Sequence, residues 1–294
     1  MEIFRTPDDR FENLPGFPYE PSYREWRGMR LAHIDEGEGP PVVMLHGEPT
    51  WSFLYRKVMG PLLESGYRCV APDLPGFGRS DKPPDESWYS YDNHTAAVTA
   101  LFEELDLRDV TLVMQDWGGP IGLRLATLEI PERVSRLVVM DTGVFTGHQR
   151  MSDEWLRFRD FVARVQDTPV KRLIRGACKT PPPPEVLAAY EAPFPGEEFK
   201  AGVRAFPQLV PLRPEDPGAA EGRAVAGALE DDSRPKLLLW ADSDPVLPLE
   251  QAGRGLQRLL RLEELTVIED AGHFLQEDRG EHIGNLIAGW LAES

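Results

Sequence analysis

Short apolar runs alternate along this chain with segments that have helical spacing, and this alternation constrains the fold more than any other feature. Apolar runs bounded by turn signals fit strands that are buried on both faces. Strands of this kind, separated by helices, imply a mostly parallel central sheet with helices on both faces, an α/β fold. The predicted strands occupy residues 42–45, 69–72, 110–114, 137–140, 236–240 and 264–268.

The alternation stops between residues 143 and 233. This stretch has helical spacing interrupted by prolines, four of them consecutive at residues 181–184, and it contains no strand-like run of comparable quality. We interpret it as an inserted helical cap. The chain then divides into a first part of the main domain (1–142), the cap (143–233) and a second part of the main domain (234–294).

Turn signals also predict how the chain begins. Residues 24–35 alternate enough to suggest a strand or hairpin, and the cluster GEGPP at residues 37–41 is the predicted turn.

The charge balance narrows the range of partners. With 49 acidic and 32 basic side chains, the net charge is −17, which repels phosphate backbones and anionic membrane surfaces. We therefore expect no nucleic-acid partner. No segment approaches the roughly 20 apolar residues that a membrane span needs, and no basic stretch followed by an apolar one opens the chain. A cytoplasmic protein with reduced Cys69 and Cys178 is expected.

Candidate catalytic residues follow the predicted strands. In an open parallel sheet, functional groups gather where the strands end, and His46, Asp116, the pair Asp242 and Asp244, and His273 all lie in such loops. The order aspartate, acid, histidine is the chain order of an α/β-hydrolase triad, in which the nucleophile lies on a tight turn between a strand and a helix. His46 comes too early for this order, so we expect a structural role for it.

The turn at residues 114–119 reads MQDWGG, with Asp116 where a serine would be expected. A carboxylate can displace a leaving group from saturated carbon, which leaves an alkyl ester that water must hydrolyse. A histidine with an acid partner serves as the general base for that water, and backbone N–H groups stabilise the oxyanion. The leaving group would be a halide or the oxygen of an opened epoxide.

With these motifs the sequence resembles the haloalkane dehalogenases, a family of the α/β-hydrolase fold. The family implies hydrolysis of small haloalkanes by water to an alcohol, a halide ion and a proton, with no metal and no organic cofactor. The HGEPTW and QDWGG stretches carry most of the specificity. The matching stretches are HGEPTW (46–51), DLPGFGRSDKP (73–83), QDWGG (115–119), APFPG (192–196) and DAGHFLQ (270–276).

The resemblance assigns roles to individual positions. It places the nucleophile at Asp116 and the base at His273. The positions of Glu48 and Trp117 are those whose backbone N–H groups form the oxyanion hole of the family, and the indole N–H of Trp117 would bind the departing halide. An indole donates a hydrogen bond and accepts none, so it suits an anion in a dry pocket.

The second halide donor of the family is an asparagine directly after the His-Gly pair or a tryptophan from the cap. Glu48 stands at the asparagine position here, so the cap must supply the donor. Trp155 is the only tryptophan of the insert and takes this role, while Phe158 and Phe161 are candidate pocket walls.

The triad acid has three candidates. Asp244 is preferred over Asp242, because it directly precedes the Pro-Val pair that usually follows the acid in this fold. Asp141 follows the predicted strand at 137–140, where one branch of the family keeps its acid, although that branch also has the asparagine that this chain lacks.

Other functions use parts of the same pattern. Epoxide hydrolases share the aspartate and the histidine, but they activate the epoxide with two cap tyrosines, and only Tyr190 lies in the insert. A fluoroacetate-type dehalogenase would need arginines beside the nucleophile, where Trp117 stands instead. A non-catalytic binding protein of the same fold is the alternative from a different class.

Overall fold

One eight-stranded sheet forms the centre of the computed structural model, which describes residues 2–293. Its strand order is β1-β2-β4-β3-β5-β6-β7-β8, and the strands from β4 to β8 run parallel while β2 is antiparallel to both neighbours. The strands are β1 (Pro21–Trp26), β2 (Met29–Glu36), β3 (Pro41–Leu45), β4 (Arg68–Pro72), β5 (Val110–Gln115), β6 (Val134–Met140), β7 (Lys236–Ala241) and β8 (Thr266–Ile268).

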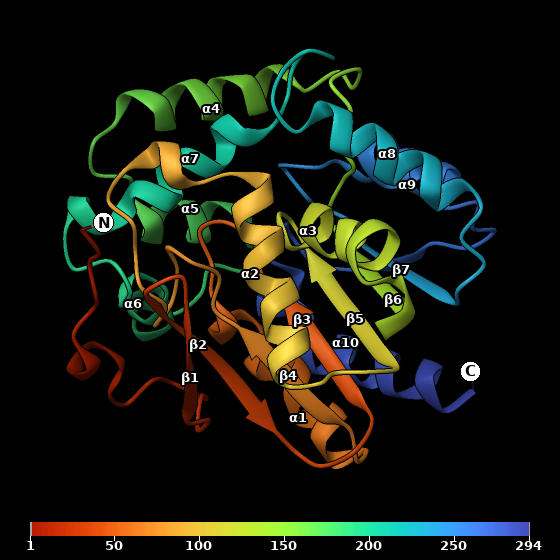
Figure 1. The fold of residues 1–294 in the computed structure, drawn as a ribbon, viewed down its shortest axis with the longest axis horizontal. Coiled ribbons are helices and arrows are strands. Elements are labelled where there is room, and N and C mark those ends of the chain that lie inside the picture. The colour runs from red at the N-terminus through yellow and green to blue at the C-terminus, as the bar shows by residue number, and fades with distance from the viewer. Residues whose placement is uncertain (1, 294) are drawn as a thin grey trace.

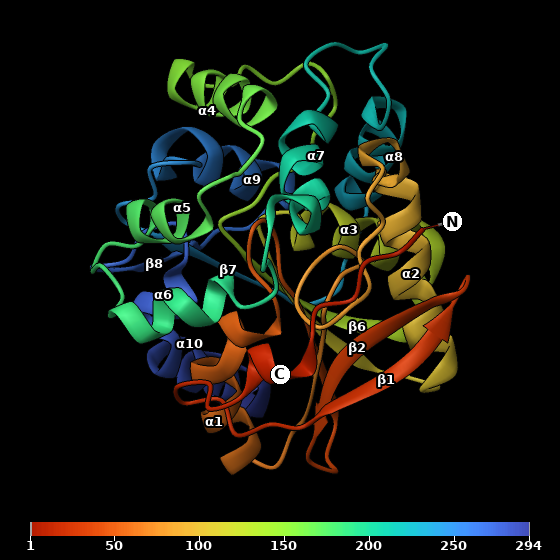
Figure 2. The ribbon, with the colours of Figure 1, turned by 90° about the vertical axis from the view of Figure 1, so that its left-hand side faces the viewer.

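Helices cover both faces of this sheet, which explains why its central strands are apolar on both sides. All six residues of β5 are buried. Helices α1 (Arg56–Glu64) and α10 (Leu275–Glu293) pack against each other on one face, and α2 (Tyr91–Glu104) and α3 (Gly118–Arg124) lie on the opposite face (Figure 2). Helix α9 (Arg254–Leu259) lies between β7 and β8 in the chain. The predicted α/β fold class is confirmed.

Five helices fill the chain between β6 and β7. Figure 1 shows α4, α5 and α7 together at one end of the sheet, toward which β5 points. The N-terminus of α4 is capped by Ser152, whose hydroxyl accepts a hydrogen bond from the backbone N–H of Trp155. The five helices are α4 (Asp153–Arg164), α5 (Val170–Ala177), α6 (Pro184–Glu191), α7 (Ala201–Leu209) and α8 (Ala219–Glu230).

The N-terminal hairpin forms, but the predicted position of its turn is wrong. Strands β1 and β2 are joined at Arg27 and Gly28, both of which have positive φ angles of 50° and 78°. Two-residue hairpin turns of this type need positive φ at both positions. Residues 37–41 instead connect β2 to β3.

Two further predictions concern the cysteines and the absence of a membrane-spanning helix in residues 2–293. Cys69 and Cys178 are both free thiols, as expected, and both are buried. Within this described range, no helix combines the length and hydrophobicity that crossing a bilayer requires.

Candidate active site

Asp116 lies at a strained turn between β5 and α3. Its φ angle is +49°, in the left-handed region that non-glycine residues rarely adopt. Gly118 and Gly119 make the turn feasible. A Cβ atom at residue 118 would collide with the Leu45 carbonyl, and one at residue 119 would collide with the Thr142 side chain. The Thr142 hydroxyl donates a 2.6 Å hydrogen bond to the Asp116 carbonyl and fixes the turn. The backbone at Asp116 is therefore held in a strained conformation that fixes the position of its carboxylate.

The two carboxylate oxygens of Asp116 have different partners. Oδ1 accepts a 2.8 Å hydrogen bond from the backbone N–H of Glu48, and Oδ2 lies 3.4 Å from Nε2 of His273. Gly47 has no room for a side chain, since its Cβ would overlap the Asp116 carboxylate. The loop after β3 thus presents a backbone donor directly to this carboxylate.

His273 connects Asp116 to a second acid. Its Nδ1 lies 2.8 Å from Oδ2 of Asp244, whose other oxygen accepts hydrogen bonds from the backbone N–H groups of Val246 and Leu247. Burial alone would lower the pKa of His273, but the charges of Asp244 and Asp116 prevail and raise it well above its usual value.

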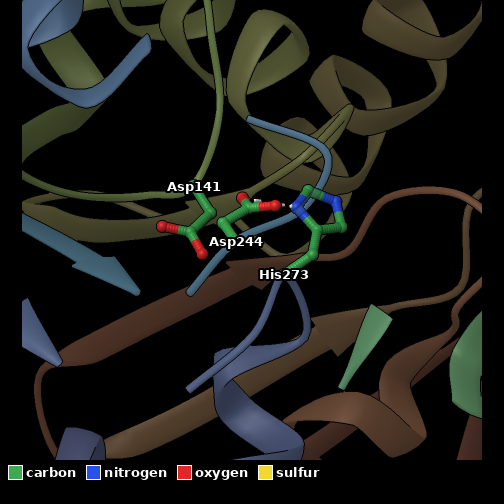
Figure 3. A group of neighbouring side chains, drawn as sticks. All are labelled: Asp141, Asp244 and His273. Atoms are coloured by element: carbon green, nitrogen blue, oxygen red, sulfur yellow. Dashed lines mark hydrogen bonds and ion pairs between the residues drawn. The ribbon is translucent and has the colours of Figure 1, made fainter. Parts of the chain in front are cut away.

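The structure separates the three candidates for the acid. Asp242 accepts hydrogen bonds from the backbone N–H groups of Asp270 and Ala271 and does not contact His273. Asp244 lies between Asp141 and His273 (Figure 3), so Asp141 lies on the far side of Asp244 from the imidazole. Asp141 is fully buried, and burial followed by the charge of Asp244 raises its pKa well above the usual range. Asp244 is the candidate that bonds the histidine.

Asp141, Asp244 and His273 also form the one cluster with metal-ligand character in residues 2–293, with one donor atom from each within 4.8 Å of the others. Nδ1 of His273 already bonds Asp244. The cluster therefore fits an acid–base pair with a supporting carboxyl group rather than a coordination sphere.

A cavity of about 280 Å³ lies over Asp116, Trp117 and His273. Its walls come from the insert and from the loops that follow the strands, and most of the side chains are apolar. A dry cavity strengthens electrostatic interactions with a reacting group. The apolar walls include Phe145, Leu173, Pro207, Val210, Val246 and Leu247.

Two tryptophans of this cavity differ from other buried tryptophans. The indole N–H groups of Trp51 and Trp240 donate to the carbonyls of Ala189 and Leu247. Trp117 and Trp155 both line the cavity, and among residues 2–293 neither indole N–H has a hydrogen-bond partner. Buried tryptophans usually satisfy this donor, so the two unpartnered indoles distinguish this cavity from the rest of the described core.

One predicted pocket wall is wrong. Phe158 lines the cavity, but Phe161 is 44% exposed and lies on the outer surface of α4. The reason is helical phase: Trp155, Phe158 and Val162 share one face of the helix at spacings of three and four, whereas residue 161 points about 120° away from residue 155.

Glu48 contributes more than its backbone. The side chain is buried, lines the cavity and has one carboxyl oxygen without a hydrogen-bond partner. Burial, followed by the negative charge of Asp116, raises its pKa well above the usual value, which favours the neutral acid.

Gln115 is a site residue that the sequence reasoning did not single out. Its amide nitrogen donates to the carbonyl of His273 at 3.0 Å and lies 3.2 Å from Nε2 of the same residue. A polar residue at the end of a wholly buried strand, next to Asp116, was the available signal. His46 accepts a hydrogen bond from the backbone N–H of Leu74 and is not part of the series of contacts from Asp116 through His273 to Asp244.

Comparison with known proteins decides the family. The sequence profile of the α/β hydrolase fold matches residues 40–178. The chain is 39% identical to a haloalkane dehalogenase of Psychrobacter cryohalolentis, covering 100% of this chain and 99% of that protein. It is 42% identical to a haloalkane dehalogenase of Mycolicibacterium paratuberculosis, covering 99% and 98%. The chain belongs to the haloalkane dehalogenases.

Solved structures agree with this family assignment. The haloalkane dehalogenase DpaA from Paraglaciecola agarilytica NO2, described as tetrameric, superposes with a TM-score of 0.91 at 35% identity and covers 97% of each chain. The haloalkane dehalogenase DbeA from Bradyrhizobium elkani superposes with a TM-score of 0.83 at 28% identity, covering 93% of this chain and 98% of that one. The predicted family is confirmed, and this haloalkane dehalogenase is a hydrolase that acts on carbon–halide bonds.

Proposed function

We propose that this dehalogenase converts small haloalkanes and water into an alcohol, a halide ion and a proton through a covalent ester on Asp116. The observation that carries the proposal is the Asp116 carboxylate, held by the Glu48 N–H and 3.4 Å from His273 on the wall of an apolar cavity. Halide and proton release from bromo- and chloroalkanes, compared with ring opening of epoxides, tests this function.

The first step forms the ester. Because Oδ1 of Asp116 is held by the Glu48 N–H, Oδ2 is the atom that attacks the carbon bearing the halogen. A carbon–oxygen bond forms, the carbon–halogen bond breaks, and the halide leaves with the bonding electron pair. The unpartnered indole N–H groups of Trp117 and Trp155 supply charge-assisted hydrogen bonds to it.

The second step removes the ester. His273 takes a proton from a water molecule that attacks Cγ of Asp116, and the N–H groups of Glu48 and Trp117 stabilise the oxyanion. The bond from Cγ to the alkyl oxygen then breaks, and the alcohol leaves with the proton from His273. Asp116 is left as a carboxylic acid and returns to its carboxylate by releasing the proton of the overall reaction. Asp244 orients the imidazole and stabilises its charged form.

Alkylation also prepares His273 for this second step. In the free enzyme the charge of Asp116 helps to raise the pKa of His273. The ester carries no charge, so its formation lowers that pKa. Ester formation therefore shifts His273 toward the neutral imidazole, the form that can act as a base, while Asp244 continues to raise its pKa.

We also propose that the chain works as a main domain, 1–142 and 234–294, with residues 143–233 as its cap. The cap contributes Trp155 and Phe158 to the cavity, and the main domain contributes Asp116, Asp244 and His273.

The alternative as an epoxide hydrolase lacks its activating groups. Tyr190 is fully buried, and its hydroxyl donates to Glu277 at 2.8 Å. Within residues 2–293, no tyrosine lines the cavity over Asp116.

Trp155→Phe should weaken halide binding by about tenfold, or ~1.4 kcal/mol, because it keeps an aromatic ring but removes one N–H donor to an anion. Bromide titration followed by calorimetry measures this effect. Trp290→Phe, in α10, is the matched control and should bind bromide as the parent does. An unchanged bromide Kd in Trp155→Phe would remove this residue from the halide site.

Asp244→Asn should lower kcat by roughly 10³-fold, with a range of about one order of magnitude either way, because the amide no longer holds the proper imidazole tautomer. Asp242→Asn is the comparison two residues away; it weakens the backbone hydrogen bonds of the His273 loop but not the bond to the imidazole, so its loss in kcat should be at least about tenfold smaller. Steady-state halide release measures both, and equal losses would contradict the assignment of Asp244.

A further inference from the structure

Asp278, near the start of α10, connects the cap to the loop that carries the catalytic histidine. Its Oδ2 accepts hydrogen bonds from the backbone N–H groups of Gly272 at 2.9 Å and Lys179 at 2.8 Å. Its Oδ1 accepts a third from the backbone N–H of Thr180 at 2.9 Å. Gly272 directly precedes His273, whereas Lys179 and Thr180 follow α5 in the cap. One half-buried carboxylate therefore bonds the backbone of both domains.

Other contacts also join the cap to the loops that carry His273 and Asp244. The backbone N–H of His273 donates to the carbonyl of Ala177 at 2.8 Å. Gly272 permits this approach, because a Cβ atom there would collide with the Ala177 carbonyl. The Lys179 ammonium donates to the hydroxyl of Ser243 at 2.9 Å, and Ser243 directly precedes Asp244. Residues 177–180 of the cap thus contact the loops of both the base and the acid.

We propose that Asp278 is a positioning residue for His273 and that it acts on ester hydrolysis in particular. The His273 backbone is held on one side through Gly272 and Asp278 and on the other by the cap carbonyl of Ala177. Loss of the carboxylate frees the first of these attachments and lets the imidazole shift relative to Asp244. This inference rests on the proposed mechanism, in which His273 works as a base only in the second step.

The test is Asp278→Ala, which removes both acceptor oxygens and with them the hydrogen bonds from the backbone N–H groups of Gly272, Lys179 and Thr180. Small misplacements of a catalytic group cost up to about 100-fold in rate. With bromoethane, we expect ester hydrolysis to slow by about 10- to 100-fold, while the first-turnover burst of bromide stays within about threefold of the parent. Quenched-flow bromide release and the intact mass of the alkylated protein measure the two steps separately.

Tyr190→Phe provides the matched control. It removes the hydrogen bond from Tyr190 in α6 to Glu277, which also crosses from the cap to the main domain but does not touch the His273 loop. Both steps should stay within about threefold of the parent in this variant. Asp278→Glu keeps the carboxylate on a longer arm, so it should slow hydrolysis less than Asp278→Ala does, and it serves if the alanine variant does not fold.

Three outcomes would overturn the role of Asp278: equal slowing of both steps, the same step-specific loss in Tyr190→Phe, or hydrolysis at the parent rate in Asp278→Ala. These failures leave the mechanism intact as long as the parent enzyme forms the ester. Absence of any ester in His273→Gln, which lacks the base for its hydrolysis, would instead contradict the proposed mechanism itself.

Discussion

Asp116→Ala should abolish halide release, with a loss of at least about 10⁴-fold in kcat/KM. The variant has no nucleophile, and water alone is a poor replacement for a carboxylate that is held next to the carbon in a mostly apolar cavity. The Glu48 N–H, the two indole donors and the cavity remain, so substrate binding should survive. Halide and proton release from bromo- and chloroalkanes, with bromide binding measured on the same preparation, tests this result.

Asp160→Ala is the control for removing a carboxylate from this acidic protein. Asp160 is exposed on the outer side of α4, and its loss should leave turnover unchanged. Halide release by Asp116→Ala above about a hundredth of the parent rate would show that Asp116 is not the nucleophile.

His273→Gln should stop the enzyme after one turnover. Formation of the ester does not require a base, so a burst of about one halide per active site should remain. Hydrolysis does require one, and the loss of general base catalysis lowers its rate by about 10²- to 10⁴-fold. The protein should therefore accumulate with the mass of one alkyl group added.

Quenched-flow halide measurement and intact mass spectrometry follow the two steps in His273→Gln. Asp116→Ala is the comparison, since it should show neither the burst nor the added mass. Sustained turnover in His273→Gln, or loss of the burst together with turnover, would contradict the assignment of His273 to the second step.

The sequence predicted the main framework because apolar runs and helical spacing are local signals. Each predicted strand lies within or overlaps an observed strand, and the tight turn at Asp116 follows from the glycines after it. The hairpin turn was misplaced because the GEGPP cluster is a stronger breaker than Arg27-Gly28, although only the latter has the paired positive φ angles that such a turn needs.

Side-chain direction set the limit of prediction within the site. Asp242 and Asp244 follow the same strand two residues apart, and only the loop conformation decides which of them bonds His273. Phe161 was misplaced because the start of α4, and hence its helical phase, is fixed by the Ser152 cap and by packing. The contacts of Asp278 join segments about 100 residues apart, and no local pattern predicts such a pairing.

The covalent ester on Asp116 is the central claim, and a single turnover in heavy-oxygen water tests it most directly. With enzyme in excess over a bromoalkane, the alcohol should carry ordinary oxygen taken from Asp116, and the heavy oxygen should appear in the Asp116 carboxylate of the digested protein. Heavy oxygen in the first-turnover alcohol would mean that water displaces the halide directly, and the ester mechanism would be wrong.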